Sequence, residues 1–244
     1  MRYKIEISYD GSAFYGFQKQ PNKETIQECL EKAISQVLKQ NIEIVGCGRT
    51  DAGVSAISAV CHFDYDKEID SRNFIGYTNN LLPNLIKVRN ISKVNDEFHA
   101  RYSAKSKTYD YYFYIDGETP FYDKFATNIG YNISIEKMKN ACKYFVGEHD
   151  FSSFCASNTS VVDKTRIIYD IEIIELGNNL YKLSIRGNGF LYNMVRIIMG
   201  TLVDVGLGKI QSENINDIIL CKDRTKAGKT INSKGLVLKK IDYW

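Results

Sequence analysis

The stretch YKIEISY at residues 3–9, followed by TIQECLEKAISQVL at residues 25–38, decides the fold class of this chain. In the first segment apolar side chains alternate with polar ones, and this period of two predicts a β-strand with one buried face. In the second, Thr25 and Glu28 have the spacing of a capping box, and the apolar residues that follow recur at helical intervals. The sequence therefore predicts a strand followed by an amphipathic helix.

The same alternation of periods continues along the first half of the chain. Short strands are predicted at residues 42–47, 56–65 and 86–94. A helix is predicted over residues 72–82, and it ends before Pro83 because proline cannot continue a helix. The predicted order of elements in this half is βαββαβ.

The second half is predicted to repeat this rhythm. Its first strand is crowded with tyrosines, Ser134 is placed to cap a helix, and Gly177-Asn178-Asn179 is a good hairpin turn. The predicted strands span 108–115, 166–176, 180–186 and 235–243, and the last two predicted helices span 190–205 and 213–221.

These patterns predict an α+β protein made of two units of related βαββαβ topology. Largely antiparallel sheets with helices on one face are expected in each unit. The Lys- and Ser-rich stretch SAKSK at residues 103–107 marks the boundary, so we expect an N-terminal unit at 1–103 and a C-terminal unit at 104–244. A cleft between the two units is the expected place for an active site.

The composition does not by itself show whether the protein binds nucleic acid, but it argues against a membrane protein. The net charge of +3 permits a polyanionic partner without requiring one, so the argument for nucleic acid depends on where the charges lie. The first seven residues, MRYKIEI, carry charges throughout, and no apolar stretch reaches the roughly 20 residues that a membrane span needs. We therefore expect a cytoplasmic protein that is not bound to a membrane.

No metal site or disulfide is expected. The six cysteines include no C-x-x-C pair, and several fall inside apolar periodic segments, which is typical of reduced core residues. The three histidines are far apart, and the tripeptide Glu148-His149-Asp150 has no further ligands at helical spacing.

Three motifs of nucleotide- or RNA-binding proteins are incomplete in this chain. Gly228-Lys229-Thr230 ends like a P-loop, but Asp223 stands where the first glycine should be. Gly187-Asn188-Gly189 lacks the third glycine of a dinucleotide-binding turn, since Tyr192 takes its place. The segment 186–192 resembles an RNA-recognition motif only in part, because its apolar residues continue with helical spacing.

The most unusual string is GCGRTDAG at residues 46–53, between two predicted strands. Its three glycines allow sharp turns and a close approach of the backbone to a ligand. The string presents a cation and an anion two residues apart, Arg49 and Asp51. On spacing alone, a tight turn with a surface ion pair is the better interpretation, and a functional loop is the alternative.

This string and five further segments, in the same order, resemble the motifs of the bacterial TruA family of tRNA pseudouridine synthases. The segments are YDGS at 9–12 with YGFQ at 15–18, FHARYSA at 98–104 followed by KTY at 107–109, DFSSF at 150–154, GNGFL at 187–191 with MVR at 194–196, and KDR at 222–224.

The resemblance implies a role for each matching residue. Asp51 matches the nucleophilic aspartate, and Arg49 matches an arginine that helps to extrude the target base. Tyr109 matches the tyrosine that stacks on that base, and Arg196 matches the arginine that pairs with the aspartate. The family acts as a homodimer, without metal or cofactor, on uridines 38, 39 and 40 of the tRNA anticodon stem-loop.

Three positions depart from the family pattern: Ser55 stands in place of a usual His, Leu85 in place of a common Asp, and Ile231-Asn232-Ser233 in place of an Ala-Pro-Ala-like run. Two alternatives therefore stay open: a TruA-like paralogue that acts on another RNA, and a non-catalytic RNA-binding module. If they share one surface, nine basic residues are predicted to contact the phosphates along an RNA backbone. They are Lys105, Lys107, Lys164, Arg166, Arg186, Lys222, Arg224, Lys226 and Lys229.

Overall fold

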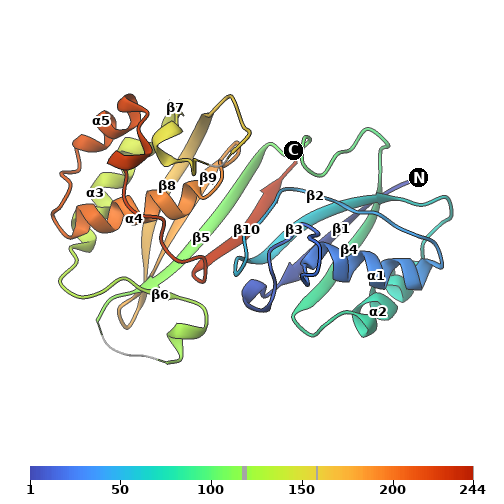
Figure 1. Ribbon diagram of the computed structural model, residues 1–244. Helices are drawn as coiled ribbons and strands as arrows, with labels where there is room; N and C mark the ends of the chain where they lie inside the picture. Colours follow the sequence, from blue (N-terminus) through green and yellow to red (C-terminus); the bar gives the residue numbers. More distant parts are fainter. Residues whose placement is uncertain (117–119, 158, 244) are drawn as a thin grey trace. The chain divides into compact units, whose positions relative to one another are not determined.

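The computed structural model describes residues 1–116, 120–157 and 159–243, and the chain divides into two compact units (Figure 1). Unit 1 contains Met1–Lys105 together with the chain from Val237 onward, and unit 2 contains Ser106–Leu236. The division lies two residues beyond the boundary expected from the sequence. The end of the chain differs from the expected 104–244 unit, because Val237 and Leu238 pair in parallel with Ser55 and Ala56 of unit 1.

Unit 1 has the predicted order of elements. They are β1 (Arg2–Tyr9), α1 (Ile26–Leu38), β2 (Val45–Gly46), β3 (Ser55–Asp64), α2 (Ser71–Leu81) and β4 (Ile86–Val94), followed at the end of the chain by β10 (Leu236–Asp242). β1 lies between β4 and β3 and is antiparallel to both, while β10 lies parallel to β3 on its other side. The sheet of this unit is therefore mostly antiparallel, as predicted.

Side-chain periodicity explains how this sheet is covered. Every second residue of β1 is buried, and the ring of Tyr3 stacks on Phe63 of β3, which in turn stacks on Phe74 of α2. Helices α1 and α2 contact each other and lie side by side (Figure 1). Thr25 caps α1 by accepting a hydrogen bond from the Glu28 N–H at 3.4 Å, as the sequence predicts.

In unit 2 the strands β5, β9, β8 and β7 are neighbours in that order, and each is antiparallel to the next. Its elements are β5 (Ser106–Tyr114), β6 (Thr127–Asn128), α3 (Ile135–Cys142), β7 (Gly147–Asp150), β8 (Thr165–Gly177), β9 (Leu180–Gly187), α4 (Met194–Gly206) and α5 (Asn214–Cys221). The short strands β6 and β7 were not predicted, since two and four residues are too few to show a period. Apart from these two short strands, the elements follow the predicted order, except that the last predicted strand, β10, belongs to unit 1.

Two local features of unit 2 follow from single residues. The predicted hairpin joins β8 to β9, and Gly177, Asn178 and Asn179 all have positive φ angles. Helix α4 begins at Met194 instead of residue 190, because Asn193 takes a left-handed conformation with φ 61°. Most of α4 is buried. Among the described residues, no helix is long and apolar enough to cross a membrane.

Candidate functional site

The GCGRTDAG string forms the connection between β2 and β3 in unit 1. Its three central residues differ in exposure: Arg49 is exposed, Thr50 is buried and Asp51 is half-buried. Gly53 has a φ of 81°, a conformation that favours glycine, and the Val54 N–H donates to the Asp51 carbonyl at 3.2 Å. The chain thus turns tightly just after Asp51, and we refer to residues 47–54 as the Asp51 loop.

A second segment, residues 9–17, forms hydrogen bonds with the Asp51 loop. The hydroxyls of Tyr9 and Thr50 share a hydrogen bond of 2.9 Å, and the Phe17 N–H donates to the Thr50 carbonyl at 3.1 Å. Gly16 has a φ of 90°, and a Cβ there would lie 2.7 Å from the same carbonyl. Because Thr50 immediately precedes Asp51, these contacts fix the backbone that carries the carboxylate.

The far end of the loop is tied to the same segment. The Gly11 N–H donates to the Ser55 hydroxyl at 3.0 Å, and a Cβ on Gly11 would overlap the Val54 carbonyl. Ser55 is one of the positions that depart from the family pattern. In this chain its hydroxyl serves as a tether of the loop, so the departure is compatible with a fixed position for Asp51.

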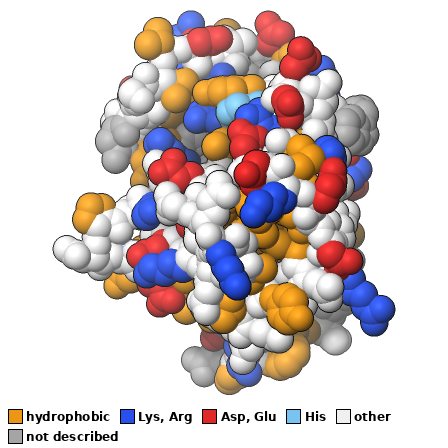
Figure 2. Space-filling model, turned by 90° about the vertical axis from the view of Figure 1, so that its right-hand side faces the viewer, with side chains coloured by type: hydrophobic (Ala, Val, Ile, Leu, Met, Phe, Trp, Pro, Cys, Tyr) orange, Lys and Arg blue, Asp and Glu red, His pale blue; other side chains and the backbone are white. Residues whose placement is uncertain are grey.

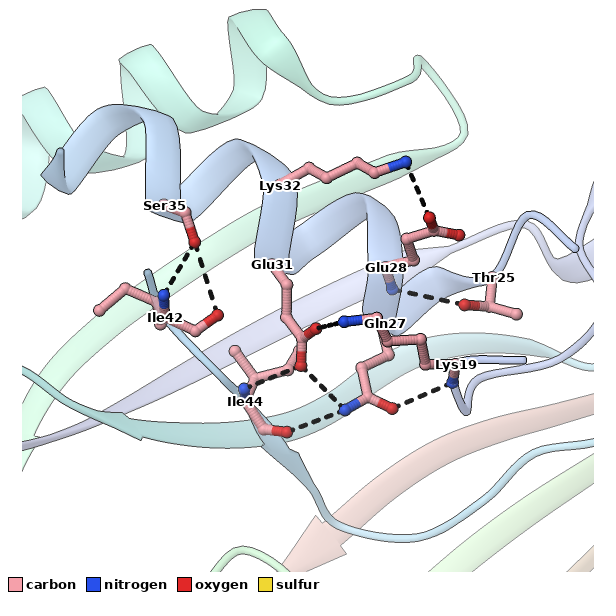
Figure 3. Close-up of polar contacts among 9 residues, drawn as sticks. All are labelled: Lys19, Thr25, Gln27, Glu28, Glu31, Lys32, Ser35, Ile42 and Ile44. Atoms are coloured by element: carbon pink, nitrogen blue, oxygen red, sulfur yellow. Dashed lines mark hydrogen bonds and ion pairs between the residues drawn. The ribbon is translucent and has the colours of Figure 1, made fainter. Parts of the chain in front are cut away.

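Helix α1 supports both segments through a polar network (Figure 3). The buried Glu31 carboxylate accepts from the Ile44 N–H at 3.2 Å and from Lys19 Nζ at 2.9 Å. The Gln27 side chain donates to the Ile44 carbonyl and to Glu31, and it accepts from the Lys19 N–H. Ile44 immediately precedes β2, which leads into the Asp51 loop, and Lys19 lies two residues after Phe17. The network therefore connects α1 to both segments whose contacts hold Thr50. The sequence pattern does not mark Gln27 or Glu31 as functional, because polar residues on an amphipathic helix ordinarily face solvent.

We predict that Gly16→Ala lowers activity about tenfold or more and destabilises the protein by about 1–2 kcal/mol. The native φ of 90° is unfavourable for alanine, and the added Cβ crowds the Thr50 carbonyl, so the Asp51 loop is expected to shift. Gly76→Ala is the matched control, since Gly76 lies inside α2 and a Cβ there meets nothing within 4 Å. That change should leave activity unaltered and stabilise the protein by about 0.5–1 kcal/mol. Thermal unfolding and activity assays of both variants check the prediction, and equal activities would contradict it.

Unit 2 carries the predicted stacking residue. Tyr109 lies on β5 opposite Ile185 of β9 and is half-buried. Its ring meets the Phe190 ring edge to face, with centroids 5.2 Å apart and an interplanar angle of 87°. Phe190 therefore restricts the orientation of the Tyr109 ring, which favours a stacking role.

Arg196 lies in the first turn of α4 and is half-buried. Its Nε donates to the Ile231 carbonyl at 2.8 Å, and its Nη1 donates to Asn193 Oδ1 at 2.6 Å. The Ile231 N–H donates back to the Arg196 carbonyl at 3.4 Å. The guanidinium is thus oriented by main chain at position 231, so the departure from the family pattern at Ile231 leaves these contacts intact.

The predicted site residues are divided between the units: Arg49 and Asp51 belong to unit 1, and Tyr109 and Arg196 belong to unit 2. Their catalytic roles and the pairing of Asp51 with Arg196 stay predictions. In the described part of the chain, no group of three or more His, Cys, Asp or Glu residues has an arrangement that could hold a metal ion. His149 Nε2 instead lies 3.1 Å from the Val146 carbonyl.

Several of the basic residues predicted to follow RNA phosphates have acidic or carbonyl partners within the protein. Lys222 Nζ lies 2.8 Å from Asp150, and Arg186 Nε lies 2.7 Å from Asp170. Arg224 donates to main-chain carbonyls. On the face shown in Figure 2, basic and acidic side chains are interspersed, in agreement with the small net charge of +3.

Comparisons with known proteins agree with the motifs. A family model described as "tRNA pseudouridine synthase" matches residues 6–103 and 141–244. The chain is 47% identical to "tRNA pseudouridine synthase A" of Bacillus licheniformis, over 100% of this chain and 99% of that protein. It is 42% identical to the protein of the same name from Bacillus subtilis, with the same coverage. Among solved structures, "Crystal Structure of a Cbf5-Nop10-Gar1 Complex" matches with a TM-score of 0.38 and 13% identity, over 97% of this chain and 58% of that chain, which is too weak to bear on function.

Proposed function

Because the chain belongs to the tRNA pseudouridine synthase family, we propose that it isomerises uridines 38, 39 and 40 of the tRNA anticodon stem-loop to pseudouridine, with Asp51 as the nucleophile. It is an isomerase that acts on tRNA. The observation that carries the catalytic assignment is the preorganised Asp51 loop, held by Tyr9, Phe17 and Ser55. A loop fixed this firmly is suited to hold a reacting group in place.

The reaction breaks the bond between N1 of the base and C1′ of the ribose and forms a bond from C5 to C1′. The C5 hydrogen leaves as a proton, and N1 gains a proton, so no oxidant or reductant is needed. A carboxylate is a suitable nucleophile because it is ionised at neutral pH. We propose that Arg196 pairs with Asp51 in the active enzyme, compensating its charge and directing it toward the substrate.

A target uridine in or beside a stem must leave the stack, which costs a few kcal/mol. In our proposal the exposed Arg49 side chain, two residues before Asp51, helps to extrude the base. The Tyr109 ring, oriented by Phe190, then stacks on it, which contributes about 1–3 kcal/mol. The active site would thus draw residues from both units of the chain.

Mapping pseudouridine in total RNA from cells with and without the gene tests the proposed substrate. Loss of pseudouridine at tRNA positions 38, 39 and 40 alone is the expected result. Loss in another RNA, with these positions unchanged, would favour the paralogue with a different substrate. If no position changes and the purified protein binds RNA without converting it, the chain is a non-catalytic RNA-binding module.

We propose further that the protein acts in the cytoplasm as a homodimer. A tRNA is longer than one 27.9 kDa subunit, so contacting both its anticodon stem and its elbow is easier with two subunits. Light scattering at micromolar concentration should give about twice the mass of the chain. A monomer that keeps full activity would contradict the dimer.

A further inference from the structure

The segment that follows α5 folds back onto helix α4. Residues Ala227 and Gly228 are buried, and the Gly228 N–H donates to the Thr201 hydroxyl at 2.9 Å. A Cβ on Gly200 would overlap the Lys229 carbonyl, and a Cβ on Gly228 would lie 2.5 Å from the Gly200 carbonyl carbon. Two glycines thus allow the backbone of this segment to lie directly against the helix that carries Arg196.

Arg224 holds this segment in shape. Its Nη1 donates to the carbonyls of Ala227 at 3.3 Å and Gly228 at 3.0 Å, and its Nη2 donates to the Thr230 hydroxyl at 3.1 Å. The side chain is half-buried, and burial lowers the pKa of its guanidinium. A planar guanidinium with five N–H donors suits this geometry, because it spans several acceptors of one turn at once.

The segment leads directly to a contact with Arg196. Ile231 follows Thr230, and its carbonyl accepts the 2.8 Å hydrogen bond from Arg196 Nε. Arg224 therefore fixes residues 227–230, and these residues fix the carbonyl that orients the Arg196 guanidinium.

We propose that Arg224 is a positioning residue that sets the direction of Arg196 for the pseudouridine reaction, and that it is not a phosphate contact. The sequence places Arg224 among the basic residues predicted to follow RNA, but its donors bind three acceptors of its own chain. This inference rests on the proposed role of Arg196. It adds a second arginine whose effect on the reaction passes through the main chain of residues 227–231.

The test compares Arg224→Ala, Arg224→Lys and Thr230→Val, each measured in two ways. Single-turnover conversion of tRNA reports on the reaction step, and filter binding over a series of salt concentrations reports on phosphate contacts. Arg224→Ala should slow single turnover about tenfold to a hundredfold, because small displacements of a catalytic group have effects of this size. Arg224→Lys should be intermediate, and Thr230→Val, which removes one acceptor, should slow the step a few fold. Affinity for tRNA and its salt dependence should stay close to wild type in all three.

Lys139→Ala is the matched control, since it removes one positive charge from an exposed position on α3 of the same unit. It should leave the single-turnover rate unaltered. A double variant, Arg224→Lys with Arg196→Lys, should be little slower than Arg196→Lys alone, because both changes act on the same group. If Arg224→Ala does not fold, the Lys and Val variants and the double variant still decide the question.

A weaker affinity and a shallower salt dependence, with an unchanged single-turnover rate, would make Arg224 a phosphate contact and overturn the proposal. Wild-type rates in both Arg224→Lys and Thr230→Val, or additive effects in the double variant, would also overturn it. Failure of the proposed function has a different outcome, since the wild-type protein itself would then form no pseudouridine in tRNA.

Discussion

Asp51→Asn is expected to lower pseudouridine formation in tRNA at least about 10³-fold while leaving tRNA affinity within a few fold. The amide keeps the shape of the side chain and removes the nucleophile. The described tethers of the loop use Thr50, Ser55 and the Asp51 carbonyl, and the substitution leaves these groups in place. Affinity should persist because binding of RNA depends mostly on contacts with its phosphates.

Release of tritium from C5-labelled uridine in tRNA measures the activity of this variant. Asp66→Asn is a suitable control, because it removes a carboxylate from an exposed position of the same unit. The control should keep wild-type activity and a similar melting temperature. Substantial turnover by Asp51→Asn would mean that another group is the nucleophile, and the role of the Asp51 loop would have to be reconsidered.

Arg196→Ala should lower the single-turnover rate by about 10²-fold, and Arg196→Lys should lie between this variant and wild type. Removing one partner of a fully buried ion pair costs about 3–5 kcal/mol, and partial exposure of Asp51 and Arg196 reduces this figure. Lysine restores the charge but lacks the planar fork that contacts Ile231 and Asn193 together. The rates of both variants under single-turnover conditions check this order.

The variant Asn193→Gly keeps the positive charge of Arg196 but removes the hydrogen bond between Arg196 Nη1 and Asn193 Oδ1. Glycine keeps the left-handed backbone at this position, with φ 61° in the native chain, and removes the oxygen that accepts from Arg196 Nη1. We expect this variant to be slowed only a few fold. Arg196→Ala with wild-type activity would show that the Arg196 charge has no part in the reaction. Asn193→Gly as slow as Arg196→Ala would show that the charge is not sufficient without the Asn193 contact.

The order of elements in unit 1 was predictable because its strands and helices are long enough to show their periods. β1 alternates over eight residues, and α1 has a capping residue followed by thirteen helical residues. In unit 2 the strands β6 and β7 are too short to show a period. The start of α4 was misplaced by four residues, since the apolar pattern gives no sign that Asn193 adopts a left-handed conformation.

The sequence by itself determined which residues are expected to form the active site. Motif spacing marks Arg49, Asp51, Tyr109 and Arg196, because the resemblance depends on side-chain chemistry at fixed places along the chain. Only the tertiary structure decided what holds them. Tyr9 lies 41 residues from Thr50, and Ile231 lies 35 residues from Arg196, yet each pair shares a hydrogen bond. Such contacts, like the pairing of Val237 with Ser55, join segments whose local patterns carry no information about each other, and they form only when the chain packs.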